Sequence, residues 1–144
     1  MNGKIIKLPL SEATAHDFAL SWVAYCNRGD VEALLEYFAE DCIFESPFAE
    51  KHVGTTRLTS KAALRAYWEK ARDQVGTVRF DIDCVAITPS QRTLLIVHRM
   101  LLGGDHQYSC DRLIFNEEGR IASGMGLYGP PVLPPVAAPG AAAS

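Results

Sequence analysis

The spacing of apolar residues divides the chain into a helical half and a half made of strands. In the first half they recur every three to four positions, as they do on one face of a helix. This periodicity predicts three helices, over 11–28, 31–38 and 60–75. Residues suited to capping a helix start each of them: Ser11, Asp30 and Ser60. Between the second and third helices, alternation over 42–46 predicts a strand, and the aperiodic run 48–59 predicts a loop.

In the second half the period is two, which is typical of strands with one buried face. Strands are expected over 77–88, 92–102, 106–115 and 120–128. Turn residues separate them, and Gly103-Gly104 is a strong signal for a two-residue hairpin loop. Helices followed by an antiparallel meander predict an α+β fold, with the N-terminal helices covering one face of a curved antiparallel sheet.

The periodic pattern ends before the chain does. Residues 1–10 are interpreted as a lead-in, 11–129 as one domain and 130–144 as a tail outside the fold. The tail is rich in Pro and Ala and has few groups able to pack. A chain of 144 residues is long enough for one domain with a real core.

Composition narrows the possible partners. Apolar residues make up 48% and charged residues 22%, and the formal charge is −3 with no cluster of Lys and Arg, so we expect no nucleic acid partner. No apolar run approaches the roughly 20 residues that span a bilayer, and the N-terminus lacks a signal-peptide core, so we expect no membrane partner and a cytoplasmic location. The four cysteines form no close pair and the histidines show no convergent spacing, so no metal is expected.

One pair of side chains in the predicted sheet has the potential for chemistry. If the two glycines form a two-residue loop, Leu102 pairs with Asp105, and His98 then lies opposite Ser109. His98 and Asp111 become diagonal neighbours on one face, with side chains able to meet. A shift of the register by one residue would separate them.

Two interpretations of this pair stay open. In the first, Asp111 lies in an apolar cavity where its neutral form is favoured, and it donates a hydrogen bond to a carbonyl or acts as a general acid. His98 is then a base, or the group that keeps Asp111 ionised. In the second, the two side chains satisfy each other as a buried pair.

Five segments of the chain form a recognisable set. They are Gly-Asp-Val-Glu-Ala-Leu at 29–34, Tyr-Phe-Ala-Glu-Asp at 37–41, Phe-Glu-Ser-Pro-Phe at 44–48, Ala-Leu-Arg-Ala-Tyr-Trp at 63–68 and Asp-Arg-Leu-Ile-Phe-Asn-Glu-Glu-Gly-Arg-Ile at 111–121. Over about 12–128 the chain resembles the NTF2-like superfamily, in particular its SnoaL-like and ketosteroid isomerase-like branches. The resemblance implies a cystatin-like α+β cone, in which a strongly curved sheet wraps around a long helix and encloses a deep pocket. It also implies a small apolar molecule as ligand and often a homodimer through the sheet face.

The resemblance also suggests site residues. It places the oxyanion-binding aspartic acid of ketosteroid isomerases at Asp111, their general base at Ser46 and their tyrosine at Trp22. A serine hydroxyl cannot replace a carboxylate as the base, so the classical isomerase activity is not expected. Asp111 and His98 are the predicted catalytic residues. The predicted ligand-binding residues are Trp22, Cys26, Phe38, Phe44, Ser46, Trp68, Phe80, Met100, Ser109, Gly124, Gly126 and Tyr128.

Three functions therefore remain open. The first is an enzyme without a cofactor, of the isomerase, cyclase or dehydratase type, that moves a proton on an apolar carbonyl compound of steroid- or polyketide-like character. The second is a binding protein that uses the same pocket without chemistry. The third is an interaction or dimerisation module whose cavity is incidental and filled by side chains.

Overall fold

The structure, a computed structural model, describes residues 4–76 and 78–133. Its helices are α1 (Glu12–Arg28), α2 (Val31–Leu35), α3 (Ala49–Val53) and α4 (Lys61–Val75). Its strands are β1 (Phe38–Glu45), β2 (Arg57–Leu58), β3 (Val78–Thr88), β4 (Thr93–Leu102), β5 (Asp105–Phe115) and β6 (Ile121–Pro131), with a 3-10 turn, Pro89–Gln91, between β3 and β4. The start of the predicted lead-in (1–3), Thr77 and most of the predicted tail (134–144) lie outside the described residues.

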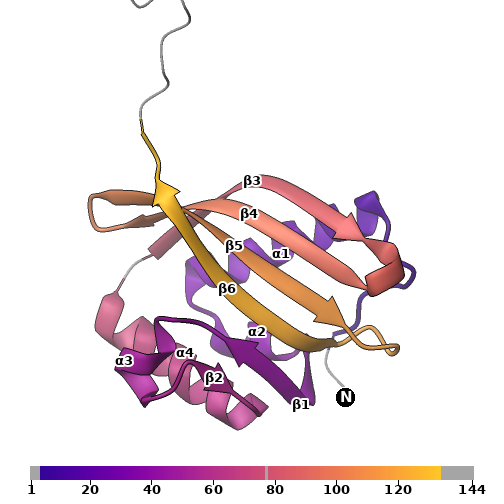
Figure 1. The fold of residues 1–144 in the computed structure, drawn as a ribbon, viewed down its shortest axis with the longest axis horizontal. Coiled ribbons are helices and arrows are strands. Elements are labelled where there is room, and N and C mark those ends of the chain that lie inside the picture. The colour runs from indigo at the N-terminus through magenta and orange to yellow at the C-terminus, as the bar shows by residue number, and fades with distance from the viewer. Residues whose placement is uncertain (1–3, 77, 134–144) are drawn as a thin grey trace, which may run out of the picture.

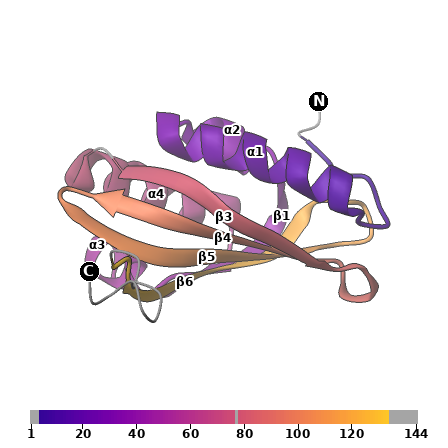
Figure 2. The same cartoon turned by 90° about the horizontal axis from the view of Figure 1, so that it is seen from above.

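The six strands form one curved, unclosed sheet in the order β2-β1-β6-β5-β4-β3. The strands β3 to β6 make the predicted antiparallel meander, and α1 crosses one face of it (Figures 1 and 2). The predicted α+β cone is therefore confirmed, with one correction. β1 pairs with β6 in parallel, so the sheet is mixed rather than antiparallel. These two strands are far apart in the chain, and no turn between them could have revealed how they pair.

The first helix forms as its capping residues predict. The Ser11 hydroxyl accepts a hydrogen bond from the Thr14 backbone N–H at 3.2 Å, and the helix ends at Gly29, whose φ of 64° favours glycine. Its apolar stripe is buried: Ala15, Phe18, Ala19, Trp22 and Val23. This stripe packs against the inner face of the sheet and holds Trp22 over its centre.

Two predicted elements differ from the structure. The second helix ends at Leu35, and Phe38 begins β1 instead of completing the helical face, because the backbone there pairs with Ile121 of β6. The predicted loop 48–59 contains α3 and β2. β2 is only two residues long, and α3 has only five, so neither is long enough to show a period in the sequence.

Two further corrections concern the strands at the edge and at the end. The regular alternation expected over 77–88 is broken by a bulge between Ile82 and Cys84, which moves the following residues to the opposite faces and leaves Cys84 exposed. The last strand continues past Tyr128 to Pro131.

The described part of the lead-in packs against the domain. Ile6 and Leu10 are buried in the core, and the Ile6 N–H donates to the Gly119 carbonyl at 2.9 Å. A side chain at Gly119 would place its Cβ only 2.3 Å from the Ile6 carbonyl oxygen, so this close approach requires glycine.

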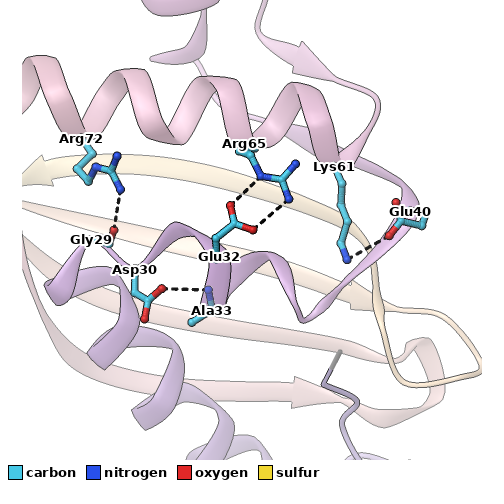
Figure 3. A network of polar contacts seen from close by, with 8 residues as sticks. All are labelled: Gly29, Asp30, Glu32, Ala33, Glu40, Lys61, Arg65 and Arg72. Atoms are coloured by element: carbon cyan, nitrogen blue, oxygen red, sulfur yellow. Dashed lines mark hydrogen bonds and ion pairs between the residues drawn. The ribbon is translucent and has the colours of Figure 1, made fainter. Parts of the chain in front are cut away.

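A network of polar contacts holds α4 beside α2 and β1 (Figure 3). It consists of the pairs Arg65–Glu32 at 2.7 Å and Lys61–Glu40 at 3.3 Å, and of the Arg72 guanidinium donating to the Gly29 carbonyl at 3.3 Å. Exposed ion pairs of this kind contribute little energy each. They join α4 to α2 and β1, and α4 supplies one wall of the cavity described next.

Within residues 4–76 and 78–133, no helix has the length and apolar character needed to cross a membrane.

Candidate functional site

A cavity of about 240 Å³ lies between the inner face of the sheet, α1 and α4. Most of the side chains that line it are aromatic or aliphatic. They include Trp22 of α1, Phe44 of β1, Trp68 of α4, Phe80 of β3 and Met100 of β4. The Trp68 ring meets those of Phe44 and Trp22 edge-on, with ring centroids 5.4 and 6.2 Å away.

A carboxyl group lies in this apolar wall, and two neighbours converge on one of its oxygens. The Trp22 indole N–H donates to Oδ2 of Asp111 at 3.1 Å, and Nε2 of His98 lies 3.1 Å from the same oxygen. The other ring nitrogen of His98, Nδ1, lies 2.5 Å from the Ser109 hydroxyl. His98 and Ser109 are direct partners across β4 and β5, so the register predicted from the glycine hairpin is confirmed.

The Ser109 hydroxyl and Oδ2 of Asp111 occupy the two ring nitrogens of His98. The His98 side chain is only 3% exposed. The Asp111 side chain is 18% exposed, and its Oδ1 accepts no hydrogen bond from the described residues. Asp111 is therefore the member of this cluster that can meet a ligand.

A second polar cluster, of hydroxyl groups, lies in another part of the wall. The Ser46 hydroxyl is 3.1 Å from the Tyr67 hydroxyl and accepts a hydrogen bond from the Phe48 backbone N–H at 3.3 Å. Burial raises the pKa of both Tyr67 and Tyr128, and the charge of Asp111 raises both further, while contact with Ser46 opposes the rise. Both phenols therefore keep their protons at neutral pH.

The cysteine in the wall is not poised as a nucleophile. Burial raises the pKa of Cys26 well above its ordinary value, and the nearby charge of Asp111 adds to this rise. A thiol with a raised pKa stays protonated and unreactive at neutral pH. The side chain contributes to the apolar surface of the cavity instead.

Most of the predicted site residues do line the cavity. Beside Asp111 and His98 these are Trp22, Cys26, Phe44, Trp68, Phe80, Met100, Ser109 and Tyr128. Four others lie behind the wall: Phe38, Ser46, Gly124 and Gly126.

The residues behind the cavity wall pack against the residues that line the cavity. Phe38 packs against Trp22 and Trp68, with ring centroids 6.0 and 5.6 Å away. The space above Gly124 is filled by the Phe44 ring. A Cβ on Gly124 would lie 2.7 Å from that ring.

Several lining residues were not predicted. Among them are Phe48, Lys51 and His52, which lie on or next to α3, and Tyr67 on α4. The first three were missed because their segment had been interpreted as a loop. Tyr67 was not singled out, although a hydroxyl on the buried face of a helix is a signal for a polar contact.

No group of three or more His, Cys, Asp or Glu side chains within the described ranges is arranged to hold a metal ion.

The fold and the cavity together define a class of protein: a single α+β cone whose helices and curved sheet enclose a small, mostly apolar pocket. The SnoaL-like domain family matches residues 19–123, which is most of the chain. The protein therefore belongs to the SnoaL-like family, and the resemblance to NTF2-like proteins inferred from its sequence is confirmed.

Solved structures agree on the fold. A SnoaL-like protein of unknown function from Burkholderia thailandensis is 22% identical, with a TM-score of 0.73 over 84% of this chain and 99% of that one. The epoxide hydrolase/cyclase-like enzyme SalBIII of pyran ring formation in the polyether salinomycin is 18% identical, with a TM-score of 0.63 over 83% of this chain and 93% of that one. A candidate ketosteroid isomerase from Kribbella flavida is 15% identical, with a TM-score of 0.63 over 85% of this chain and 83% of that one. Among curated proteins, none matches the chain.

Proposed function

We propose that the protein is an enzyme without a cofactor that transfers a proton on an apolar carbonyl compound held in the cavity. The observation that supports this most directly is the state of Asp111. Two donors hold its Oδ2, while Oδ1 has no partner among the described residues and the side chain borders an apolar cavity. A fixed carboxylate in a poorly solvated site is suited to general acid–base catalysis.

The proposed step uses Oδ1 of Asp111. This oxygen takes a proton from the carbon next to a carbonyl, and the electron pair of the broken C–H bond moves toward the carbonyl oxygen to give an enolate. The carboxylic acid then returns the proton to a carbon of the ligand, where the electron pair forms the new C–H bond. The two hydrogen bonds to Oδ2 persist throughout, so the site needs no rearrangement.

This assignment changes the role expected of His98. The sequence suggested that His98 moves the proton, but both of its ring nitrogens already have partners. We therefore propose His98 and Trp22 as positioning residues that hold and orient Asp111. The cyclase-like enzyme and the candidate ketosteroid isomerase among the structural neighbours support a reaction of this class.

The test is deuterium exchange. A panel of apolar ketones, steroid-like and polyketide-like, is incubated with the protein in D2O, and deuterium at the carbon next to the carbonyl is followed by NMR. The wild-type protein should accelerate exchange for part of the panel, and Asp111→Asn should lower that rate by about 100-fold or more. Exchange at an equal rate in Asp111→Asn would contradict the proposal.

A non-catalytic binding protein is the second candidate. The observation that favours it is that Asp111 is the only carboxylate among the described residues that line the cavity, while the family's base position holds Ser46. This candidate predicts tight binding of apolar ketones with no exchange above the rate in buffer.

We also propose that two copies pair through the outer face of the sheet. Leu95 and Val97 alternate with residues of the cavity wall, so they face away from α1, and both are only half-buried. On the same face the buried Nε of Arg112 has no hydrogen-bond partner among the described residues. A second copy would cover the apolar side chains of this face.

A further inference from the structure

Hydroxyl groups from three elements meet behind and within the cavity wall. Ser46 follows β1, Tyr67 comes from α4 and Tyr128 from β6. Both phenols line the cavity, whereas Ser46 is buried behind them with 2% of its surface exposed. We call these three residues the hydroxyl cluster.

Counting protons shows that the hydroxyl cluster holds more of them than its own contacts use. A serine hydroxyl donates one hydrogen bond and accepts two, and the Phe48 N–H already occupies one acceptor site of Ser46. The Ser46 and Tyr67 hydroxyls share one hydrogen bond, which uses the proton of one of them. Neither contact uses the proton of the Tyr128 hydroxyl.

One unused proton belongs to the Tyr128 hydroxyl, in the cavity wall. Among the described residues the Tyr67 hydroxyl has a hydrogen bond only with Ser46, and no hydrogen bond of the Tyr128 hydroxyl is present. An O–H in an apolar wall without a partner favours an acceptor oxygen of a ligand there. The raised pKa of each phenol keeps the proton in place.

The hydroxyl cluster also lies near Asp111. Asp111 of β5 pairs directly with Gly126 of β6, and side chains at paired positions share one face of the sheet. A Cβ on Gly126 would lie 3.2 Å from the Tyr128 hydroxyl oxygen. The missing side chain of Gly126 thus leaves the space beside Asp111 to the Tyr128 hydroxyl.

The resemblance expects the side chains at positions 22 and 111 to donate hydrogen bonds to a ligand oxygen, and neither is available for this in the chain. The Trp22 N–H, which takes the place of the tyrosine in the resemblance, is already donated to Asp111 itself. In the proposed function Asp111 acts as a base, and a carboxylate has no proton to donate. A ligand oxygen in this cavity therefore needs a different donor.

We propose that the hydroxyl cluster binds the carbonyl oxygen of the ligand through a phenolic O–H of Tyr67 or Tyr128. The ligand class is then a ketone or related carbonyl compound whose apolar part fills the aromatic cavity. The placement of its neighbouring carbon against Asp111 rests on the proposed function, whereas the binding of the oxygen does not. In the enzyme, the same O–H would stabilise the enolate oxygen as its charge develops.

The test uses 2-acetylnaphthalene, an apolar ketone whose oxygen can only accept, and 2-ethylnaphthalene, which lacks the oxygen. In the wild-type protein the infrared C=O stretch of the bound ketone should lie at lower wavenumber than in an alkane solvent. The double variant Tyr67→Phe/Tyr128→Phe should abolish this shift and weaken ketone binding by about 3- to 10-fold, with binding of 2-ethylnaphthalene unchanged.

Matched variants make the result specific. Ser46→Ala should retain the shift, because both phenols keep their protons, and so should Tyr108→Phe, whose side chain does not line the cavity. The proposal is overturned if the double variant retains the shift, or if the ketone bound to the wild-type protein shows none. Loss of the shift in the double variant supports the proposal even if no deuterium exchange occurs, so its outcome is separate from that of the proposed function.

Discussion

Trp22 and His98 contact the same oxygen of Asp111, and this shared contact leaves only the other oxygen of the carboxyl group for a ligand. The two come from elements far apart in the chain, α1 and β4, so only the completed fold assembles them. At the scale of single residues, the sequence predicted the His98–Asp111 neighbourhood through the hairpin register. It did not predict the Trp22 contact, because nothing local relates a helix side chain to a strand 89 positions away.

The raised pKa of Tyr67 and Tyr128 predicts a loss of stability in alkali. An unfolded chain loses its tyrosine protons near pH 10, whereas the folded protein holds these two to higher pH. Above about pH 10 the unfolded state therefore binds fewer protons, and the free energy of unfolding falls as pH rises, by up to about 1.4 kcal/mol per pH unit for each phenol. Below that pH the contribution is fully present.

Urea unfolding from about pH 8 to about pH 11 measures this slope. The variants Tyr67→Phe and Tyr128→Phe should each lose less stability over the alkaline range than the wild-type protein. If the wild-type protein and both variants lose stability in parallel, the two phenols are not the buried neutral groups described above.

At the scale of elements, glycine positions in β6 decide how closely other elements approach the sheet. The Phe44 ring of β1 lies directly over Gly124, and the Tyr128 hydroxyl lies over Gly126. The sequence marked both glycines as pocket positions through the family resemblance. It could not show that the Phe44 ring fills the space over Gly124, because that depends on the parallel pairing of β1 with β6.

Gly124→Ala tests this close packing. Its Cβ would lie 2.7 Å from one carbon of the Phe44 ring and 3.0 Å from another, so Phe44 would have to shift within a packed core. We expect the free energy of unfolding to fall by about 1 to 3 kcal/mol, measured by urea denaturation. Gly104→Ala is the matched control, since a Cβ there has nothing within 4 Å and should change stability by less than about 0.5 kcal/mol. Equal effects of the two substitutions would argue against the packing of Phe44 on β6.

At the scale of the whole molecule, long segments with a regular apolar period predicted the architecture, whereas short segments were not predicted. The meander from β3 to β6 alternates over strands of 10 or 11 residues, and the apolar stripe of α1 extends over 17. Those lengths give a clear period. In contrast, α3 forms without a side-chain cap hydrogen bond and is held by contacts with α4. The lining residues that it carries, Lys51 and His52, were therefore missed together.

The proposed pairing of two copies is tested on the outer face of the sheet. Light scattering coupled to size exclusion should give the wild-type protein about twice the 15.8 kDa mass of one chain. Val97→Lys places a charge in the middle of this face and should give the monomer mass with little change in unfolding by urea. A wild-type protein that is monomeric over the whole concentration range would refute the pairing and leave the cavity unaffected.

The central claim is that Asp111 transfers a proton in an apolar pocket that binds its ligand largely without that carboxylate. The most direct measurement combines the deuterium exchange rate and the dissociation constant of one ketone, in the wild-type protein and in Asp111→Asn. The account predicts a loss of exchange of about 100-fold or more, with a dissociation constant changed by no more than about threefold. Exchange that survives in Asp111→Asn, or that is absent from a wild-type protein which binds the ketones of the panel, would contradict it.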